Sequence, residues 1–275
     1  MSEPDAREAA KLMAASAAKH LTDEQLAQAL ALAHESDSVE LKFTVPDSHR
    51  RLAVTALEMD PLESQVRLVY FFDTPDLALD RSGLVVRARR VQGRGDDSVV
   101  KLRPVVPGDL PASVRRSKNV VVELDALPGG FVCSASMKRA MGPDVVNATM
   151  RGERPLRKLF SKEQRKFFEA HAPKGVALDD LHTLGPILVL KLRKVAPITN
   201  RKLVAELWHY PDNQMILELS TKTMPGEAVQ VAGESRAFLA THGVDMTGEQ
   251  RTKTKTALEF FAGEIAAKET AAASV

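Results

Sequence analysis

The sequence lacks the features that mark several large classes of protein. It has one cysteine, Cys133, which excludes an internal disulfide framework and a metal site made of several thiolates. No apolar run approaches the roughly 20 residues that a membrane-spanning helix needs. The first residues are charged and include no apolar signal core, so we expect a cytoplasmic protein in a reducing compartment, with no membrane partner.

A large excess of charge of one sign is also absent. The 38 Lys and Arg residues against 36 Asp and Glu residues leave a net charge of +2 at pH 7, which gives little reason to expect a specific nucleic-acid partner. One stretch, residues 134–172, is strongly basic and has a helical pattern. Its phenylalanines have the spacing of packing residues, so we interpret it as helical with a solvated basic face. Any electrostatic function must come from local clustering of charges.

What the sequence does contain is a repeated alternation of apolar and charged residues. From Ser38 to Thr44, Val39 and Leu41 alternate with Glu40 and Lys42. Side chains of a strand point to opposite faces with period two, so this stretch predicts a strand with one apolar and one charged face. Further strands are predicted at 66–72, 84–90, 99–103, 120–125, 187–195, 201–210 and 215–220.

The length of 275 residues fits one large domain with short extensions. We predict an N-terminal helical extension over residues 1–36, a main domain over 37–265 and a flexible Ala-rich tail over 266–275. Thr22 followed by Gln25 resembles a capping box, so the extension should hold two helices that meet near Leu21. These helices pack on the domain or, alternatively, join two copies into a homodimer. Other helices are expected at 46–58, 229–241 and 249–265.

On the predicted strands, the charged residues fall two apart. They are the pairs Glu40 and Lys42, Arg87 and Arg89, Lys101 and Arg103, Glu123 and Asp125, and Lys191 and Arg193, with Glu206 and Glu218 as single carboxylates. An open antiparallel sheet with one wet face would give this pattern. A closed barrel with its apolar face under helices and its charged face inside would give it too. The scarcity of Ser and Thr on the charged face and the amount of helix favour the barrel.

A charged interior constrains what the barrel contains. Each unpaired buried ion costs several kcal/mol, whereas a domain is stable by only about 5–15 kcal/mol. The interior must therefore hold water, and a barrel of about eight strands is near the smallest that also holds a ligand. Converging Arg and Lys side chains suit phosphate oxygens, and clustered carboxylates suit Mg²⁺ or Mn²⁺. Together they meet the requirements of phosphoryl transfer.

The chain from about Ser38 to Phe260 resembles the CYTH family, the triphosphate tunnel metalloenzymes. Ser38, Glu40 and Lys42 stand where that family opens with Glu-x-Glu-x-Lys. The segment from Tyr70-Phe71-Phe72-Asp73-Thr74-Pro75 to Val86-Arg87-Ala88-Arg89 is very like its second signature. The later motifs are matched by Lys101, Glu123 to Asp125, Arg193, Glu218 to Ser220, and Lys253.

The resemblance implies an α+β protein, a closed eight-stranded antiparallel β-barrel with helices packed outside. Such barrels hydrolyse inorganic, nucleoside or thiamine triphosphates, and some cyclise ATP. The metal ligands would be Glu40 and Glu218, with Glu123 and Asp125 holding a second metal or orienting water. Lys42, Glu123 and Asp125 would be catalytic. The residues expected to bind the triphosphate or polyphosphate are Lys42, Arg87, Arg89, Lys101, Arg103, Lys191, Arg193 and Lys253.

Two serines depart from the family pattern. Ser38 stands where the first metal-binding Glu is expected, and Ser220 where a second acid often follows Glu218. A hydroxyl is a weaker metal ligand than a carboxylate, and Asp37 points to the wrong face unless a bulge rotates it. We predict a triphosphatase that uses Mg²⁺ or Mn²⁺, with reduced activity as one outcome of these serines. The alternatives are a non-catalytic polyphosphate or nucleotide binder and an adenylate cyclase.

Overall fold

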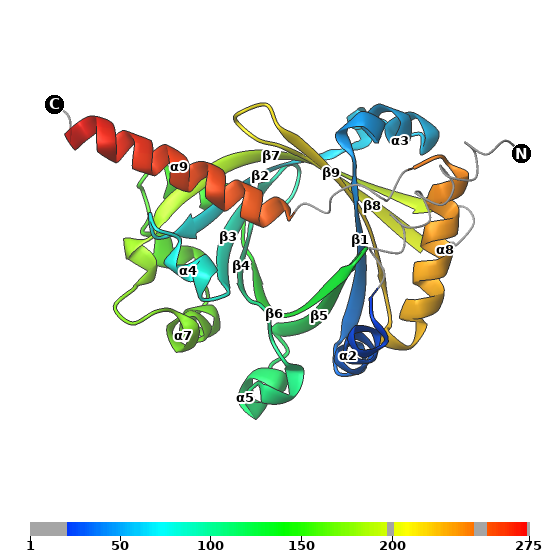
Figure 1. Ribbon diagram of the computed structural model, residues 1–275. Helices are drawn as coiled ribbons and strands as arrows, with labels where there is room; N and C mark the ends of the chain where they lie inside the picture. Colours follow the sequence, from blue (N-terminus) through cyan, green and yellow to red (C-terminus); the bar gives the residue numbers. More distant parts are fainter. Residues whose placement is uncertain (1–20, 197–200, 245–251, 274–275) are drawn as a thin grey trace, which may run out of the picture.

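The computed structural model describes residues 21–196, 201–244 and 252–273. The described strands follow the predicted alternation closely. They are β1 (Ser38–Val45), β2 (Gln65–Asp73), β3 (Leu84–Val91), β4 (Asp97–Leu102), β5 (Val120–Leu127), β6 (Gly130–Ala140), β7 (His182–Ala196), β8 (Arg201–His209) and β9 (Met215–Thr223). They form a closed barrel in the order β1-β5-β6-β4-β3-β2-β7-β8-β9, seen as a ring of strands in Figure 1. The closed barrel is confirmed, and the open sheet is wrong.

The strand directions explain why the expected eight-stranded antiparallel barrel is wrong in detail. The nine strands alternate in direction around the ring, except that β1 and β5 are parallel, with Ser38 beside Glu123 and Glu40 beside Asp125. An odd number of strands cannot alternate throughout a closed ring, so one pair has to be parallel. On its other edge β1 pairs with β9 in the antiparallel sense.

The additional strand is β6, which lies in the stretch expected to be helical from residue 134. Its outward residues Cys133, Ala135 and Met137 are buried, and Ser134 between them is buried too. Small residues such as Ser and Ala have weak strand preference, so the local sequence does not reveal it. Ladders to β5 on one side and β4 on the other supply the strand with its hydrogen bonds.

Helices surround the barrel in Figure 1. They are α2 (Asp23–His34), α3 (Arg50–Ala56), α4 (Ala78–Arg81), α5 (Ala112–Arg115), α6 (Val145–Met150), α7 (Lys162–His171), α8 (Ala228–Thr241) and α9 (Lys253–Ala273). Short 3₁₀ turns occur at Asp47–His49, Pro61–Glu63, Pro107–Asp109, Leu156–Leu159, Leu178–Asp180 and Pro225–Glu227. None of the described helices is both long and apolar enough to cross a membrane.

The helices near the two ends of the described chain can be compared with the expected ones. The capping box of Thr22 and Gln25 starts α2, as expected, whereas the helix expected before Leu21 lies outside the described residues. The tail expected from residue 266 belongs to α9 as far as Ala273, so the boundary at 265 falls inside a helix.

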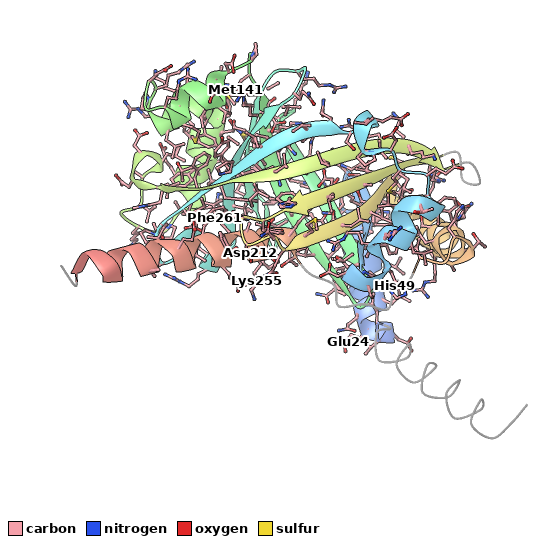
Figure 2. The ribbon with its side chains drawn as sticks, turned by 90° about the horizontal axis from the view of Figure 1, so that it is seen from above. Glu24, His49, Met141, Asp212, Lys255 and Phe261 are labelled. Atoms are coloured by element: carbon pink, nitrogen blue, oxygen red, sulfur yellow. The ribbon has the colours of Figure 1, made fainter. Side chains whose placement is uncertain are left out.

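Two apolar cores hold the barrel. The larger lies outside it, where strand residues such as Leu41 and Phe43 join Phe168 of α7 and Leu239 of α8. The smaller lies at one end of the interior, where Val69, Phe71 and Trp208 meet Leu258 and Phe261 of α9. Helix α9 therefore packs against that end of the barrel, with Phe261 on its barrel side and Lys255 on the opposite side (Figure 2).

A glycine lets β3 approach the end of β4. Gly83 has a φ of +77°, and a Cβ at this position would lie 2.3 Å from the carbonyl oxygen of Arg103. Its own carbonyl accepts a hydrogen bond from the Arg103 backbone N–H at 2.8 Å. Only a residue without a side chain fits this contact.

We expect Gly83→Ala to lower the free energy of unfolding by about 1–3 kcal/mol, because alanine is strained at this φ and collides with backbone. Gly233→Ala is the control, since no atom lies within 4 Å of a Cβ built at this helical position. This second change should raise stability by about 0.5–1 kcal/mol. Urea unfolding measures both, and equal stability of Gly83→Ala and wild type would contradict the steric account.

Candidate functional site

The charged face of the barrel encloses a cavity of about 250 Å³. Eleven of the residues that the sequence singles out line it, namely Glu40, Lys42, Arg87, Arg89, Lys101, Arg103, Glu123, Asp125, Lys191, Glu218 and Lys253. Arg193 does not line it; this residue lies beyond Lys191 on β7 and is exposed. The alternation thus brings charges from distant parts of the chain into one space.

Three further charged residues line the cavity without having been assigned to the site. Arg67 is the one cation on β2, on the same face as Val69. Glu206 was noticed as a strand carboxylate but given no role, although its two-residue offset from Trp208 places both on the inner face. Lys138 was assigned to a helix, and its position on β6 brings it inside instead. The period of two is the signal that could have found Glu206, whereas Arg67 and Lys138 have no comparable signal in the sequence.

The lining divides into two arcs of neighbouring strands. Carboxylates come from the consecutive strands β8, β9, β1 and β5, as Glu206, Glu218, Glu40, Glu123 and Asp125. Most cations come from the consecutive strands β6, β4, β3, β2 and β7, with Arg103 directly after the end of β4; they are Lys138, Lys101, Arg103, Arg87, Arg89, Arg67 and Lys191. With Lys42 and Lys253, nine cations face five carboxylates, an excess of four positive charges that suits a polyanion.

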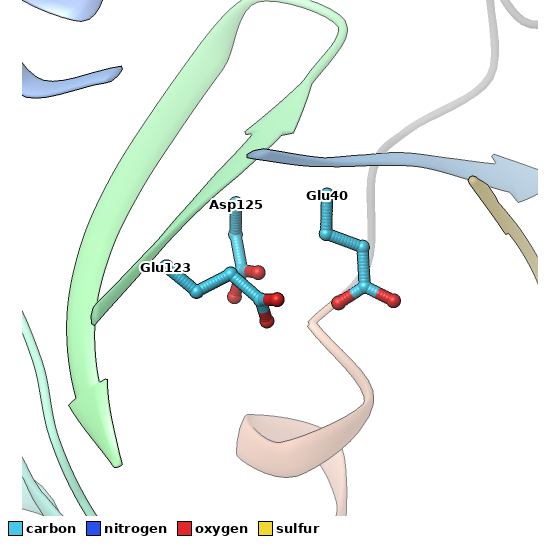
Figure 3. Close-up of side chains that lie close together, drawn as sticks. All are labelled: Glu40, Glu123 and Asp125. Atoms are coloured by element: carbon cyan, nitrogen blue, oxygen red, sulfur yellow. The ribbon is translucent and has the colours of Figure 1, made fainter. Parts of the chain in front are cut away.

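Three carboxylates in the acidic arc converge. The side chains of Glu40, Glu123 and Asp125 point toward one another in Figure 3, and each offers an oxygen within 4.8 Å of the other two. The parallel pairing of β1 and β5 produces this, since Glu40 lies directly beside Asp125. Carboxylate oxygens are the ligands of hard divalent cations, so this group is suited to bind one. Glu218 lies outside the group.

Two lysines pair with Asp125, which lines the cavity. Its carboxylate lies 2.8 Å from the Nζ of Lys42 and 3.2 Å from the Nζ of Lys101. Burial alone would raise the pKa of Asp125, but the two ammonium groups outweigh it and lower the pKa to about 2. In the same way Asp125 and Glu40 raise the pKa of Lys42 against the effect of burial.

A second ionic cluster lies where α9 meets the barrel. Lys253, the first residue of α9, contacts Glu206 and lies 2.7 Å from Glu218. Lys191 lies 2.6 Å from Glu206, and the indole N–H of Trp208 donates to the same carboxylate at 3.2 Å. The ammonium of Lys253 also lies 5.0 Å from the centre of the Trp208 ring. Burial raises the pKa of Glu206, and Lys253 and Lys191 together bring it well below its usual value.

Three of the four guanidinium groups of the basic arc have no carboxylate partner among the described residues. Within the described chain, Arg67, Arg87 and Arg103 make no ion pair, and the Nε of Arg87 is buried without a hydrogen-bond partner. Burial, and then repulsion from Arg89, lowers the pKa of Arg87 to about 10. A buried unpaired cation is costly, so these side chains are suited to an anionic ligand.

The two serines have other contacts. Ser38 donates its hydroxyl to Glu123 at 3.1 Å, and Ser220 is buried opposite Lys42 on the β1–β9 ladder. Asp37 accepts a hydrogen bond from the backbone of Val122 at 2.7 Å and lies 4.0 Å from Arg115. It therefore does not replace the carboxylate missing at Ser38.

Fold and site define a closed β-barrel with a charged interior. No family model and no curated protein matches the sequence. HpAC1 from Hippeastrum, a candidate adenylyl cyclase described as revealing a dominant triphosphatase activity, is 18% identical with a TM-score of 0.58 over 78% of this chain and 92% of that one. A candidate adenylate cyclase from Bacillus halodurans is 11% identical with a TM-score of 0.56 over 80% of this chain and 97% of that one.

At these identities the comparisons establish a shared fold. This fold is the closed barrel that the resemblance to the CYTH family implies, and its presence is confirmed here with nine strands among the described residues.

The Arg89–Asp97 pair gives a test of the ionic interior. Asp97 is buried and accepts two hydrogen bonds from Arg89, at 2.7 and 3.0 Å. Burial raises the pKa of Asp97, but Arg89 and Lys138 lower it below its usual value. This lowered pKa stabilises the folded state above the unfolded pKa of about 3.9, and the stabilisation is lost as pH falls through the folded pKa.

We expect Asp97→Asn to lower the free energy of unfolding by about 1.5–3 kcal/mol at pH 7, with a difference from wild type that shrinks below about pH 4. Denaturant unfolding at a series of pH values measures this. Asp144→Asn is the control, because Asp144 pairs with Arg90 at 3.1 Å on the surface and the pair should contribute about 0–1 kcal/mol. A difference for Asp97→Asn that stays constant down to pH 2 would contradict the assignment.

Proposed function

We propose that this protein is a metal-dependent phosphohydrolase that acts on a linear triphosphate inside the barrel. The observation that carries the proposal is the division of one cavity into a basic arc and an acidic arc. Phosphoryl transfer needs cations around the phosphate chain and carboxylates for a divalent cation beside it. The triphosphatase activity described for HpAC1, which shares the fold, supports hydrolysis as the reaction.

The roles of the residues follow from their places. Arg67, Arg87 and Arg103, which lack carboxylate partners, bind phosphate oxygens, and Arg89, Lys101 and Lys191 add positive charge around them. Glu40, Glu123 and Asp125 hold Mg²⁺ or Mn²⁺, which supplies charge neutralisation and orientation at the phosphate oxygens when bound. Lys42 pairs with Glu40 and Asp125 of this group and stabilises charge on the transferred phosphoryl group. Glu123 or Asp125 positions the attacking water.

Glu218 receives a different role from the expected one of metal ligand, whereas Lys253 keeps its expected role. Since Lys253 joins Glu218 and Glu206 at the α9 end, we assign Glu218 to the support of this cluster and Lys253 to the phosphate chain. A cytoplasmic location, the absence of a nucleic-acid or membrane partner and a homodimer stay predictions from the sequence.

Two other functions have specific support. Ser38 and Ser220, where the family has acids, favour a protein that binds polyphosphate or nucleotide without turnover. The description of both structural neighbours as candidate adenylate cyclases favours cyclisation of ATP. Cyclic AMP as the product would distinguish this last reaction from hydrolysis.

The reaction is tested by measuring phosphate release from tripolyphosphate, ATP and thiamine triphosphate with Mg²⁺ or Mn²⁺. We expect release from at least one of them, and Arg87→Ala should lower kcat/KM about 100-fold or more, because the group that neutralises the transition-state charge is lost. Lys42→Ala and Glu40→Gln should have effects of the same order.

Arg94→Ala is the matched control, since Arg94 lies exposed in the β3–β4 hairpin and should leave activity unchanged. Undiminished activity in Arg87→Ala, Lys42→Ala and Glu40→Gln together would rule out the proposed site. Formation of cyclic AMP without release of orthophosphate would rule out hydrolysis of ATP.

Binding can be separated from turnover with Trp208, because it is the one tryptophan of the chain and lies in the cavity wall. We expect tripolyphosphate to change its fluorescence, since a polyanion competes for Lys253, which lies over the ring. Fluorescence titration gives the affinity, and Trp208→Phe is the control for the signal. A fluorescence change without phosphate release, together with release restored by Ser38→Glu, would favour the non-catalytic binder.

A further inference from the structure

The three converging carboxylates are already neutralised by the chain itself. Lys42 lies 3.2 Å from Glu40 and 2.8 Å from Asp125, and Lys101 lies 3.2 Å from Asp125. The third lysine is Lys222, whose ammonium pairs with Glu123. Three negative charges thus face three positive charges, and a divalent cation that approaches meets a group with little net charge.

Lys222 differs from the other two lysines in its exposure. Its side chain is 55% exposed, whereas those of Lys42 and Lys101 are 15% and 16% exposed. Moving an ammonium group back into water is easiest when it is already largely hydrated. Of these three lysines, Lys222 is therefore the one that can leave the carboxylates at the lowest cost.

The position of Lys222 is set by the β1–β9 ladder. It lies directly opposite Glu40 and reaches across to Glu123. The carboxylate oxygen of Glu123 that it contacts also accepts the hydroxyl of Ser38. Where a metal-binding acid is expected on β1, the chain has a hydroxyl, and the neighbouring strand adds a positive charge. Both features reduce the attraction of the group for a cation.

We propose that Lys222 is a tethered counter-ion that competes with the divalent metal for Glu123 and Glu40. This inference rests on the metal-dependent function proposed above. While the lysine is in place, repulsion between the ammonium group and the metal keeps the affinity low. The metal binds when Lys222 moves out to solvent or to the phosphate chain of a bound ligand, and the lysine thereby sets the metal affinity of the site.

The test is a measurement of Mn²⁺ affinity on the full chain without nucleotide. Calorimetry gives the Kd, and the electron paramagnetic resonance signal of free Mn²⁺ gives it independently. Lys222→Gln should lower the Kd at least about tenfold, because one positive charge next to the divalent ion is removed. Lys222→Arg keeps the charge and should bind like wild type. Lys118→Gln removes an exposed lysine for which no ion pair is found among the described residues, and this variant should also bind like wild type.

Equal Kd values for wild type and Lys222→Gln would overturn the inference, as would the same gain in Lys118→Gln or the absence of Mn²⁺ binding in all variants. The proposed reaction is judged separately by phosphate release. Tighter Mn²⁺ binding in Lys222→Gln without any phosphate release would support the role of Lys222 and contradict the hydrolase.

Discussion

The structure depends on pairing each carboxylate that lines the cavity with a lysine, and Asp125 shows this constraint clearly. Its carboxylate, on β5, binds Lys42 from β1 and Lys101 from β4, so one buried acid joins three strands across the interior. Without such pairs, the desolvation of so many charges would exceed the few kcal/mol by which a domain is stable. The ion pairs keep the lumen polar and wet, and the apolar outer core carries the packing.

The strands and the lining could largely be predicted, because a period of two along each strand assigns side chains to a face without knowledge of the partner strands. Glu40, Lys42, Arg87 and Lys101 were found in this way. The strand β6 could not, since Ser134, Ala135 and Ser136 have weak strand preference and owe their conformation to the ladders on either side. The parallel pairing of β1 with β5 depends on the ring closing with an odd number of strands, which no local pattern encodes.

The sequence also did not allow us to predict which charged residues form ion pairs with each other. The family pattern places Glu218 with Glu40, yet Glu218 lies beside Lys253 of α9, and Glu40 lies with Glu123 and Asp125. Register and tilt decide these contacts, and both arise from the whole ring. Arg67 was overlooked for a simpler reason, since a single cation among apolar residues of β2 shows no repeat.

The apolar contact between α9 and the barrel makes the two ends of the interior unlike. Leu258 and Phe261 pack on Val69, Phe71 and Trp208 at one end, whereas Lys222, six residues beyond Ile216 along β9, is largely in water. A hydrated anion cannot pass through packed hydrocarbon without losing its water. An anionic ligand of the interior would therefore enter and leave at the Lys222 end of the barrel, away from α9.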